Sequence, residues 1–212
     1  MIKKKGVLCV FTKAPEPGQV KTRLIPALGK TAATELYQSL LTRTLATACS
    51  SGLVLVRLYC TPTTEHPFLQ KCANDFNVEL RLQEGGDLGA RMSNALEAGL
   101  DEFDFALVLG CDCPWLKKTD LKLAYSKLSS GAEVVLGPAA DGGYYLLGLC
   151  ALENKLFENI PWGSSSVLSE TRQCLSDMSM DCFELKEYSD LDVPEDLPAY
   201  EKLIAQHHST MG

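Results

Sequence analysis

The sequence predicts an α/β protein, a three-layer α/β/α sandwich around a mostly parallel, Rossmann-like sheet. Apolar runs of strand length alternate with helical patterns along the whole chain. The helical patterns are long enough to connect parallel strands and to cover both faces of a sheet. Unusual loops follow several of the apolar runs, as expected when the carboxyl ends of the strands share one edge.

Each element is predicted from its own pattern, in chain order. Apolar runs predict strands at 6–11, 53–60, 78–83, 105–110, 132–137 and 143–150, with a weaker run near 181–185. Periodic apolar positions predict helices at 30–50, 66–75, 88–102, 118–129, 164–177 and 195–206. The first helix shows its buried face most clearly, at Tyr37, Leu40, Leu41, Thr44, Leu45 and Ala48.

Size and composition favour one globular domain covering residues 1–212. The chain is 46% hydrophobic and 22% charged, which is ordinary for such a protein. No apolar run is long enough to span a membrane. The lysines at 3–5 resemble the start of a signal peptide, but the apolar segment behind them is short and runs into Lys13. We therefore expect neither a membrane span nor a signal peptide.

The charge distribution favours a small phosphorylated ligand. The net charge of −7 argues against nucleic acid as a partner. Cations are nevertheless concentrated at the start of the chain, where Glu16 is the one acidic residue before Arg23. A small cationic surface on an acidic protein suits a phosphorylated small molecule better than a polyanion.

The nine cysteines are scattered through apolar runs and helical patterns, and no Cys-x-x-Cys pair occurs. Because the chain has three histidines, a structural zinc site is not expected. Scattered, buried thiols predict a cytoplasmic protein, since that compartment is reducing.

The loop after the first strand carries the clearest functional signal. It is stiffened by Pro15 and Pro17, can bend at Gly18, and precedes a helical pattern. Such a loop is where α/β folds bind phosphate, although it lacks both the dinucleotide-binding and the Walker A patterns. A surface turn with incidental lysines is the alternative. The candidate phosphate-binding residues are Lys13, Lys21, Thr22 and Arg23.

Two acidic segments are candidates for a divalent cation site. Asp112 directly follows a buried strand, where a carboxylate needs a partner, and a turn or helix cap is the alternative. Asp192, or its neighbour Asp190, could reach the same cation, because Mg²⁺ favours one or two carboxylates together with substrate phosphates. Cys111 and Cys113 are interpreted as packing residues.

Two glycine-rich loops are candidates for contacts with the substrates. In the loop at 84–89, glycines would allow close approach to a planar ligand, and Arg91 would reach a phosphate or brace Asp87. In the loop at 137–143 and the residues just after it, Asp141 and Tyr144 could bind hydroxyls, although a tight turn explains the glycines equally well. Trp162 either walls a pocket or packs in the core, and Ser164 or Ser165 is expected to cap a helix. The loop glycines are Gly85, Gly86, Gly142 and Gly143.

Taken in order, these segments resemble the bacterial DUF2064 proteins, a family of glycosyltransferase type in the nucleotide-diphospho-sugar transferase superfamily. The matching segments are FTKAPEPGQVKTRL, QEGGDLGARM, GCDCPWL, GPAADGGYYLLGL, PWGSSSV and DLDVPEDL, which together extend from residue 11 to 197. The resemblance implies a GT-A-like fold. The superfamily also includes nucleotidyltransferases with a similar first loop.

The resemblance also implies roles for particular residues. Asp112 and Asp192 would bind Mg²⁺ or Mn²⁺. Cys111 stands where related proteins more often carry Ser or Thr, which removes a hydroxyl beside Asp112. The nucleotide phosphates would contact Lys13, Lys21 and Arg23; the base would lie near Gly85, Gly86 and Asp87; the sugar or acceptor would lie near Asp141, Gly142, Gly143 and Tyr144.

Three functions remain open from the sequence. A glycosyltransferase would bind a nucleotide sugar and a small-molecule acceptor, and Asp141 would take the acceptor proton if the reaction inverts. A nucleotidyltransferase would join a nucleoside triphosphate to a phosphorylated molecule and release pyrophosphate. A binding protein with a decayed site is the third. The base, the sugar, the acceptor and the oligomeric state are not specified by these patterns.

Overall fold

The computed structural model describes residues 5–52 and 55–209. The predicted strand at 53–60 therefore falls partly outside the described residues, and so do the lysines at positions 3 and 4. Within the described residues, no helix is both long enough and apolar enough to cross a lipid bilayer.

The sheet is mixed, with strand order β3-β2-β1-β4-β6-β5-β7. Strand β6 runs antiparallel to both of its neighbours, whereas the remaining pairs are parallel. The strands are β1 (Gly6–Lys13), β2 (Leu55–Thr61), β3 (Glu79–Leu82), β4 (Phe105–Gly110), β5 (Val134–Pro138), β6 (Tyr144–Leu149) and β7 (Cys182–Glu184).

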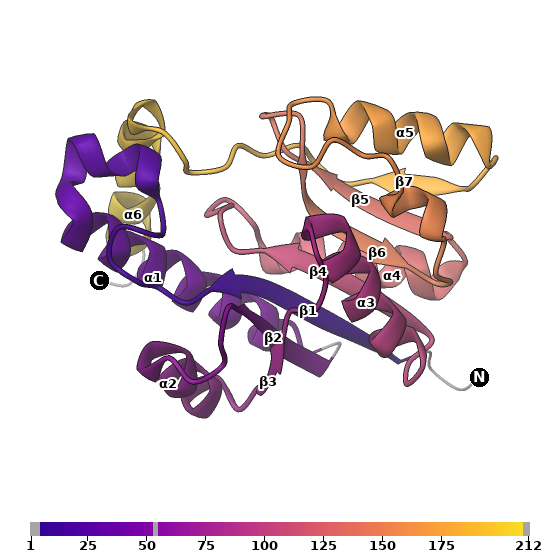
Figure 1. Ribbon diagram of the computed structural model, residues 1–212, viewed down its shortest axis with the longest axis horizontal. Coiled ribbons are helices and arrows are strands. Elements are labelled where there is room, and N and C mark those ends of the chain that lie inside the picture. Colours follow the sequence, from indigo (N-terminus) through magenta and orange to yellow (C-terminus); the bar gives the residue numbers. More distant parts are fainter. Residues whose placement is uncertain (1–4, 53–54, 210–212) are drawn as a thin grey trace.

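Helices lie on both faces of this sheet, which gives the three-layer α/β/α sandwich (Figure 1). The helices are α1 (Ile25–Ser51), α2 (Pro67–Phe76), α3 (Leu88–Leu100), α4 (Lys118–Ser130), α5 (Val167–Asp177) and α6 (Leu197–Ser209). Short 3₁₀ helices are η1 (Thr22–Leu24), η2 (Asn154–Phe157) and η3 (Pro194–Asp196).

Strand β1 shows how the two cores form. Leu8 and Val10 point into a core shared with α1, α2 and α4. Val7 and Cys9 point into the opposite core, shared with α3 and α5. Because successive side chains of a strand face opposite sides, a continuous apolar run supplies both cores at once.

Helix α6 is held apart from the sheet, beside α1 (Figure 1). Leu40 of α1 packs with Leu191 and Tyr200 in a small third core. This contact anchors the chain that leads into α6, and Asp192 lies in that chain.

The topology brings four loops to one edge of the sheet. Strands β1, β4 and β5 run in the same direction, so the loops that follow them leave at their shared carboxyl edge. Strand β6 runs the other way and begins at that edge. A bridge between Ala139 and Tyr188 brings the segment before Asp192 there as well. This is the ligand-binding edge of open α/β sheets.

Among the boundaries that differ from the predictions, two concern how a helix begins. Helical geometry is interrupted at Gly29, where φ is 78°, so the predicted start at residue 30 marks the regular part of α1. Ser166, and neither Ser164 nor Ser165, precedes α5, and its side chain makes no capping hydrogen bond. The Ser164 hydroxyl instead accepts a hydrogen bond from the Ser166 amide, 3.3 Å away.

Candidate active site

A cavity of about 560 Å³ opens at the carboxyl edge of β1 and β4. The first loop, the loop after β4 and the segment before α6 all contribute to its wall. Cationic side chains from the first loop and from α3 face carboxylates from the other two regions across the same space. The charged lining residues are Lys13, Lys21, Arg23, Arg91, Asp112, Asp190 and Asp192. We call this the cationic cavity.

The first loop is tied down at both ends. The Ala14 amide donates to the Thr61 carbonyl, 2.8 Å away, which joins the end of β1 to the end of β2. At the other end, Lys21 adopts a left-handed backbone conformation, with φ 46° and ψ 43°. That conformation is uncommon for a residue other than glycine and often marks a functional site.

Lys21 is the centre of the charge network. Its side chain is 3% exposed, and its ammonium directly contacts Asp112 Oδ1. The same Nζ lies 3.8 Å from Asp192 Oδ1. Burial lowers the pKa of Lys21, but the Asp112 carboxylate outweighs that effect, so the pKa is raised overall and the side chain stays charged.

Asp112 and Asp192 are brought together by the backbone. The Leu191 amide donates to the Asp112 carbonyl, 2.9 Å away, which joins the loop after β4 to the segment before α6. Asp196 Oδ2 accepts hydrogen bonds from the amides of Asp192 and Val193, each 2.9 Å away. Asp196 is therefore a capping residue, and Asp192 is free of that role.

Arg23 completes the network from the opposite side of Asp192. Its Nη1 lies 2.8 Å from Asp192 Oδ2. Unlike Lys21, the Arg23 side chain is 71% exposed. The two loop cations thus neutralise the two carboxylates, one in a buried contact and one at the surface.

Behind the loop, the hydroxyl of Tyr37 organises the floor of the cavity. It accepts a hydrogen bond from the Lys13 amide at 2.8 Å and lies 2.9 Å from Thr12 Oγ1. The Cys111 thiol lies 3.4 Å from the same hydroxyl. Burial raises the pKa of Cys111 to about 12, so it is a neutral thiol that packs beside Asp112.

Asp190 is the third carboxyl group on the wall of the cationic cavity. Burial, followed by the charges of Asp112 and Asp141, raises its pKa from 3.8 to about 7. Among the described residues its Oδ1 is buried without a hydrogen-bond partner. Asp190 therefore changes charge near neutral pH.

A second cavity of about 380 Å³ adjoins the first. The two share wall residues Arg23, Leu88, Tyr144 and Asp190. The rest of the second wall is acidic, hydroxylic or apolar, and comes from Met92, Asp141, Gly143, Trp162, Gly163, Ser164, Ser165 and Val167. We call this the acidic cavity.

Close backbone packing shapes the acidic cavity. A Cβ on Gly142, where φ is +89°, would lie 2.0 Å from the Ser165 carbonyl oxygen. The Leu168 amide also donates to the Gly142 carbonyl, 2.8 Å away. Only glycine fits at position 142, because a side chain would force the loop away from the start of α5.

The aromatic wall of this cavity is a packed group. Trp162 meets Tyr144 edge to face, with ring centroids 6.5 Å apart, and stacks on Phe157. A Cβ on Gly89 would lie 2.2 Å from Trp162 Nε1, so this glycine makes room for the indole. Trp162 therefore both packs on α3 and lines the cavity, which combines the two interpretations made from the sequence.

Tyr144 does not offer its hydroxyl to a ligand, contrary to expectation. Its oxygen is buried, and burial raises its pKa, with the Thr171 hydroxyl nearby. Tyr144 nevertheless lines both cavities. Asp141 is exposed, and its Oδ1 accepts a hydrogen bond from the Gly143 amide at 2.9 Å.

The loop before α3 is organised differently from the prediction. Asp87 accepts a hydrogen bond from the Ala90 amide and caps α3. A Cβ on Gly85 would lie 2.7 Å from the Arg91 amide, so this glycine allows the loop to pack closely on the start of α3. Arg91 donates to the Gly85 carbonyl, 3.2 Å away, and does not brace Asp87.

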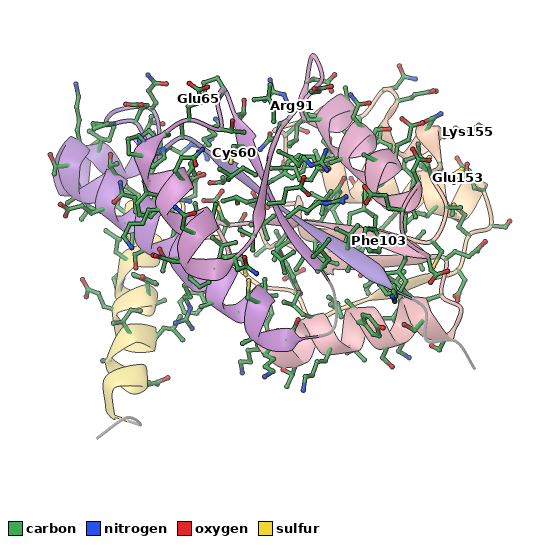
Figure 2. The ribbon with its side chains drawn as sticks, turned by 90° about the horizontal axis from the view of Figure 1, so that it is seen from below. Cys60, Glu65, Arg91, Phe103, Glu153 and Lys155 are labelled. Carbon is green, nitrogen blue, oxygen red and sulfur yellow. The ribbon has the colours of Figure 1, made fainter. Side chains whose placement is uncertain are left out.

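The cavity wall in this region is made by neighbouring residues. It includes Gln83, Leu88 and Arg91, whereas Gly85, Gly86 and Asp87 are absent from the wall of either described cavity. Figure 2 shows Arg91 near the start of α3, at the opposite end of the helix from Phe103. The Gln83 amide donates to the carbonyls of Thr12 and Tyr59 and so joins three elements.

The residues present fit a divalent cation that is bound together with a ligand. Asp112 and Asp192 are carboxylates on one cavity wall, and their side chains are 45% and 44% exposed. A third carboxylate oxygen, Asp190 Oδ1, lies buried beside them. Within the described residues, no three His, Cys, Asp or Glu side chains form a metal-binding cluster on their own. Phosphate oxygens would have to supply further ligands, as Mg²⁺ commonly requires.

Several wall residues were not anticipated from the sequence. Tyr37 looks like an ordinary core residue of α1, and no local pattern reveals its hydroxyl. Gln83 could have been found, because it ends a predicted strand at the ligand edge. Leu88 and Met92 belong to the apolar pattern of α3 and carry no separate signal.

Comparison with known proteins agrees with this fold. Residues 44–164 match DUF2064, described as an uncharacterized protein conserved in bacteria. The chain belongs to the DUF2064 family. No curated protein matches it.

Solved structures extend the comparison to nearly the whole chain. A candidate nucleotide-diphospho-sugar transferase from Desulfovibrio desulfuricans G20 is 27% identical, with a TM-score of 0.81 over 88% of this chain and 82% of that one. Two more distant structures share the fold at 12% identity. One is CMP:2-keto-3-deoxy-manno-octonic acid synthetase complexed with CTP, with a TM-score of 0.59 over 96% of this chain and 99% of that one.

The other distant structure is 4-diphosphocytidyl-2C-methyl-D-erythritol synthase from Anaerococcus prevotii DSM 20548. Its TM-score is 0.61 over 93% of this chain and 96% of that one. The DUF2064 chain therefore has the fold of nucleotide-diphospho-sugar and nucleotidyl transferases, which supports its assignment as an enzyme of the transferase class.

Proposed function

We propose that this DUF2064 protein is a metal-dependent glycosyltransferase. In this proposal the chain acts as one domain. The cationic cavity binds the diphosphate of a nucleotide sugar, and the acidic cavity binds a small acceptor that carries a hydroxyl group. The observation that carries the proposal is the charge contrast between two cavities that share a wall.

Residues of the first loop would hold the donor. Lys13, Lys21 and Arg23, with Thr22 beside them, can form charge-assisted hydrogen bonds to phosphate oxygens, and Arg91 approaches from α3. Asp112 and Asp192 would hold Mg²⁺ or Mn²⁺, which neutralises the charge of a departing nucleoside diphosphate. Each of these side chains lies on the wall of one cavity, so they can bind the same ligand.

The acidic cavity would hold the acceptor. Trp162 and the ring of Tyr144 offer apolar surface for a sugar or similar polyol, while Gly142 and Gly143 keep the neighbouring backbone close. Asp141 is exposed on this wall, and in an inverting reaction it would accept the proton of the attacking hydroxyl.

A nucleotidyltransferase is the second candidate, and the number of cations in the first cavity favours it. Such an enzyme uses a phosphorylated nucleophile. The acceptor cavity presents Asp141 and Asp190 and shares its one arginine, Arg23, with Asp192. A phosphorylated acceptor would therefore meet repulsion there, which makes glycosyl transfer the better supported function.

All nine cysteines carry free thiols in this structure. Free thiols suit a reducing compartment, so we include a cytoplasmic location in the proposal.

The decisive experiment compares leaving groups. The protein is incubated with Mg²⁺ or Mn²⁺, with panels of nucleotide sugars and nucleoside triphosphates, and with neutral or phosphorylated acceptors. Release of a nucleoside diphosphate with a neutral acceptor is expected. Release of pyrophosphate with a phosphorylated acceptor would overturn the proposal in favour of nucleotidyl transfer. Melting temperatures should be measured in parallel, because turnover without the right acceptor can be slow.

A further inference from the structure

The positions of Lys21 and Arg23 have a consequence for the order in which ligands bind. Lys21 is buried, and its ammonium contacts Asp112 while approaching Asp192. Arg23 contacts the second oxygen of Asp192. Both carboxylates on which a divalent cation would depend are therefore already neutralised by cations of the same loop.

A bare divalent cation is poorly accommodated by this arrangement. It would have to approach Asp112 and Asp192 against the positive charges of Lys21 and Arg23, in a partly buried site where charge interactions are strong. Displacing the Lys21 ammonium without a new partner would leave a buried, unpaired charge. The nucleotide-free protein should therefore bind Mg²⁺ or Mn²⁺ weakly.

A diphosphate changes this balance. Its oxygens are strong acceptors for ammonium and guanidinium groups, so they give Lys21 and Arg23 new partners. The carboxylates are then released to a cation that the phosphate also binds. The left-handed backbone of Lys21 places both residues on a short, sharply turned segment, with Lys21 immediately before η1 and Arg23 within it.

We propose that the cationic cavity takes a divalent cation only in complex with a polyphosphate, because Lys21 and Arg23 are the resident counter-ions of Asp112 and Asp192 in the nucleotide-free protein. The identity of the polyphosphate as a nucleoside diphosphate rests on the proposed function. The statement about Lys21 and the carboxylates rests on the contacts alone.

Binding of Mn²⁺ to the nucleotide-free full chain tests the proposal directly. Free Mn²⁺ is measured by electron paramagnetic resonance for the wild type, for Lys21→Met and for Lys13→Met. Lys13 is the matched control, because it lines the same cavity and is exposed at the end of β1. Removing it deletes the same charge without freeing Asp112.

Lys21→Met is expected to bind Mn²⁺ at least about 10-fold more tightly than the wild type, and Lys13→Met to change the affinity by less than about 3-fold. Two results would overturn the proposal: wild-type affinity equal to that of Lys21→Met, or equal gains in both variants. The second result would show a general charge effect.

Two further measurements keep the test interpretable. Circular dichroism checks that Lys21→Met is folded. If it is not, Arg23→Gln replaces it, since the exposed Arg23 side chain can be changed without burying a charge, and a smaller gain in Mn²⁺ affinity is expected. No gain in that folded variant would equally overturn the proposal.

Failure of the proposed function would look different. UDP and GDP are titrated into the wild type with and without Mn²⁺, and at least one is expected to bind about 10-fold more tightly with the metal. If neither nucleotides nor nucleotide sugars bind, the proposed function fails, while the comparison between Lys21→Met and Lys13→Met still stands. If nucleotide binds equally with and without metal, the coupling itself is wrong.

Discussion

The two cavities at the edge of the sheet share a wall but differ in how their charges are balanced. In the cationic cavity, Lys21 and Arg23 pair with Asp112 and Asp192 across segments far apart in the sequence. In the acidic cavity, Asp141 is held by the amide of its own turn. The first cavity can exchange its internal ion pairs for phosphate, whereas the second is suited to a neutral ligand. In the proposed function, this contrast separates the donor site from the acceptor site.

The largest expected effect comes from Asp112→Asn, which removes charge from the donor side. Metal-dependent nucleotide binding and turnover should fall roughly 10²- to 10³-fold, because preorganised charge at the diphosphate is lost. Titration calorimetry and the transfer assay measure this.

Asp101→Asn is the control, since it changes an exposed aspartate beyond the far end of α3. Unchanged metal dependence in a folded Asp112→Asn protein would contradict the assignment of the metal ligands. Acceptor binding in the other cavity should be nearly unaffected.

Asp190 lies on the wall that the two cavities share. Its charge is tested by comparing the stability of the wild type and of Asp190→Asn as a function of pH. The pKa of Asp190 is raised from 3.8 to about 7 in the folded protein, so the folded state binds this proton more tightly than the unfolded state. The contribution of Asp190 to the free energy of unfolding is therefore fully present below about pH 4, and it is lost as the pH rises through about 7. Because asparagine does not ionise, the variant should avoid this loss of stability, which amounts to at most roughly 4 kcal/mol.

Urea unfolding of both proteins in the presence of EDTA, from pH 4 to pH 8, measures the effect. The variant should gain stability relative to the wild type as the pH rises, while Asp101→Asn should follow the wild type. A difference that does not depend on pH would show that the pKa of Asp190 is the same in the folded and unfolded proteins.

Gly142→Ala should damage the acceptor side alone. The new Cβ would collide with the Ser165 carbonyl, and the positive φ adds strain on the order of 1–3 kcal/mol. Turnover with acceptor should fall about 100-fold, since small displacements of positioning residues are costly. Binding of nucleotide should change little.

Gly163→Ala separates the collision from the strain. Its φ is also positive, at +84°, but a Cβ there would meet no atom within 4 Å. A loss of turnover as large as that of Gly142→Ala would show that strain, and not the contact with Ser165, is responsible.

The smallest effect is expected from Tyr37→Phe, which sharpens the description of the donor side. Losing the hydroxyl leaves the Lys13 amide without its acceptor, which costs about 1 kcal/mol. The KM for the nucleotide sugar should rise about 5-fold with kcat nearly unchanged. Steady-state kinetics decide this, and a fall in kcat alone would place Tyr37 in the chemistry instead of in loop positioning.

The sequence was sufficient for the elements and for the ligand edge of the sheet. The apolar run at 105–110 predicts β4 and the place of Asp112, because a strand buried on both faces must be continuously apolar. The helical spacing around Leu41 and Leu45 predicts the buried face of α1 in the same way. These are local constraints, and a short window of sequence contains all of them.

Only the tertiary structure decided which charges meet. The pairing of Lys21 with Asp112 and the buried hydroxyl of Tyr144 depend on how separate elements pack. The reversal of β6, which brings Asp141 to the same edge as Asp112, is likewise a property of the whole sheet. Residue patterns report burial and local geometry, whereas a charge network depends on distances between segments that the chain brings together only when it folds.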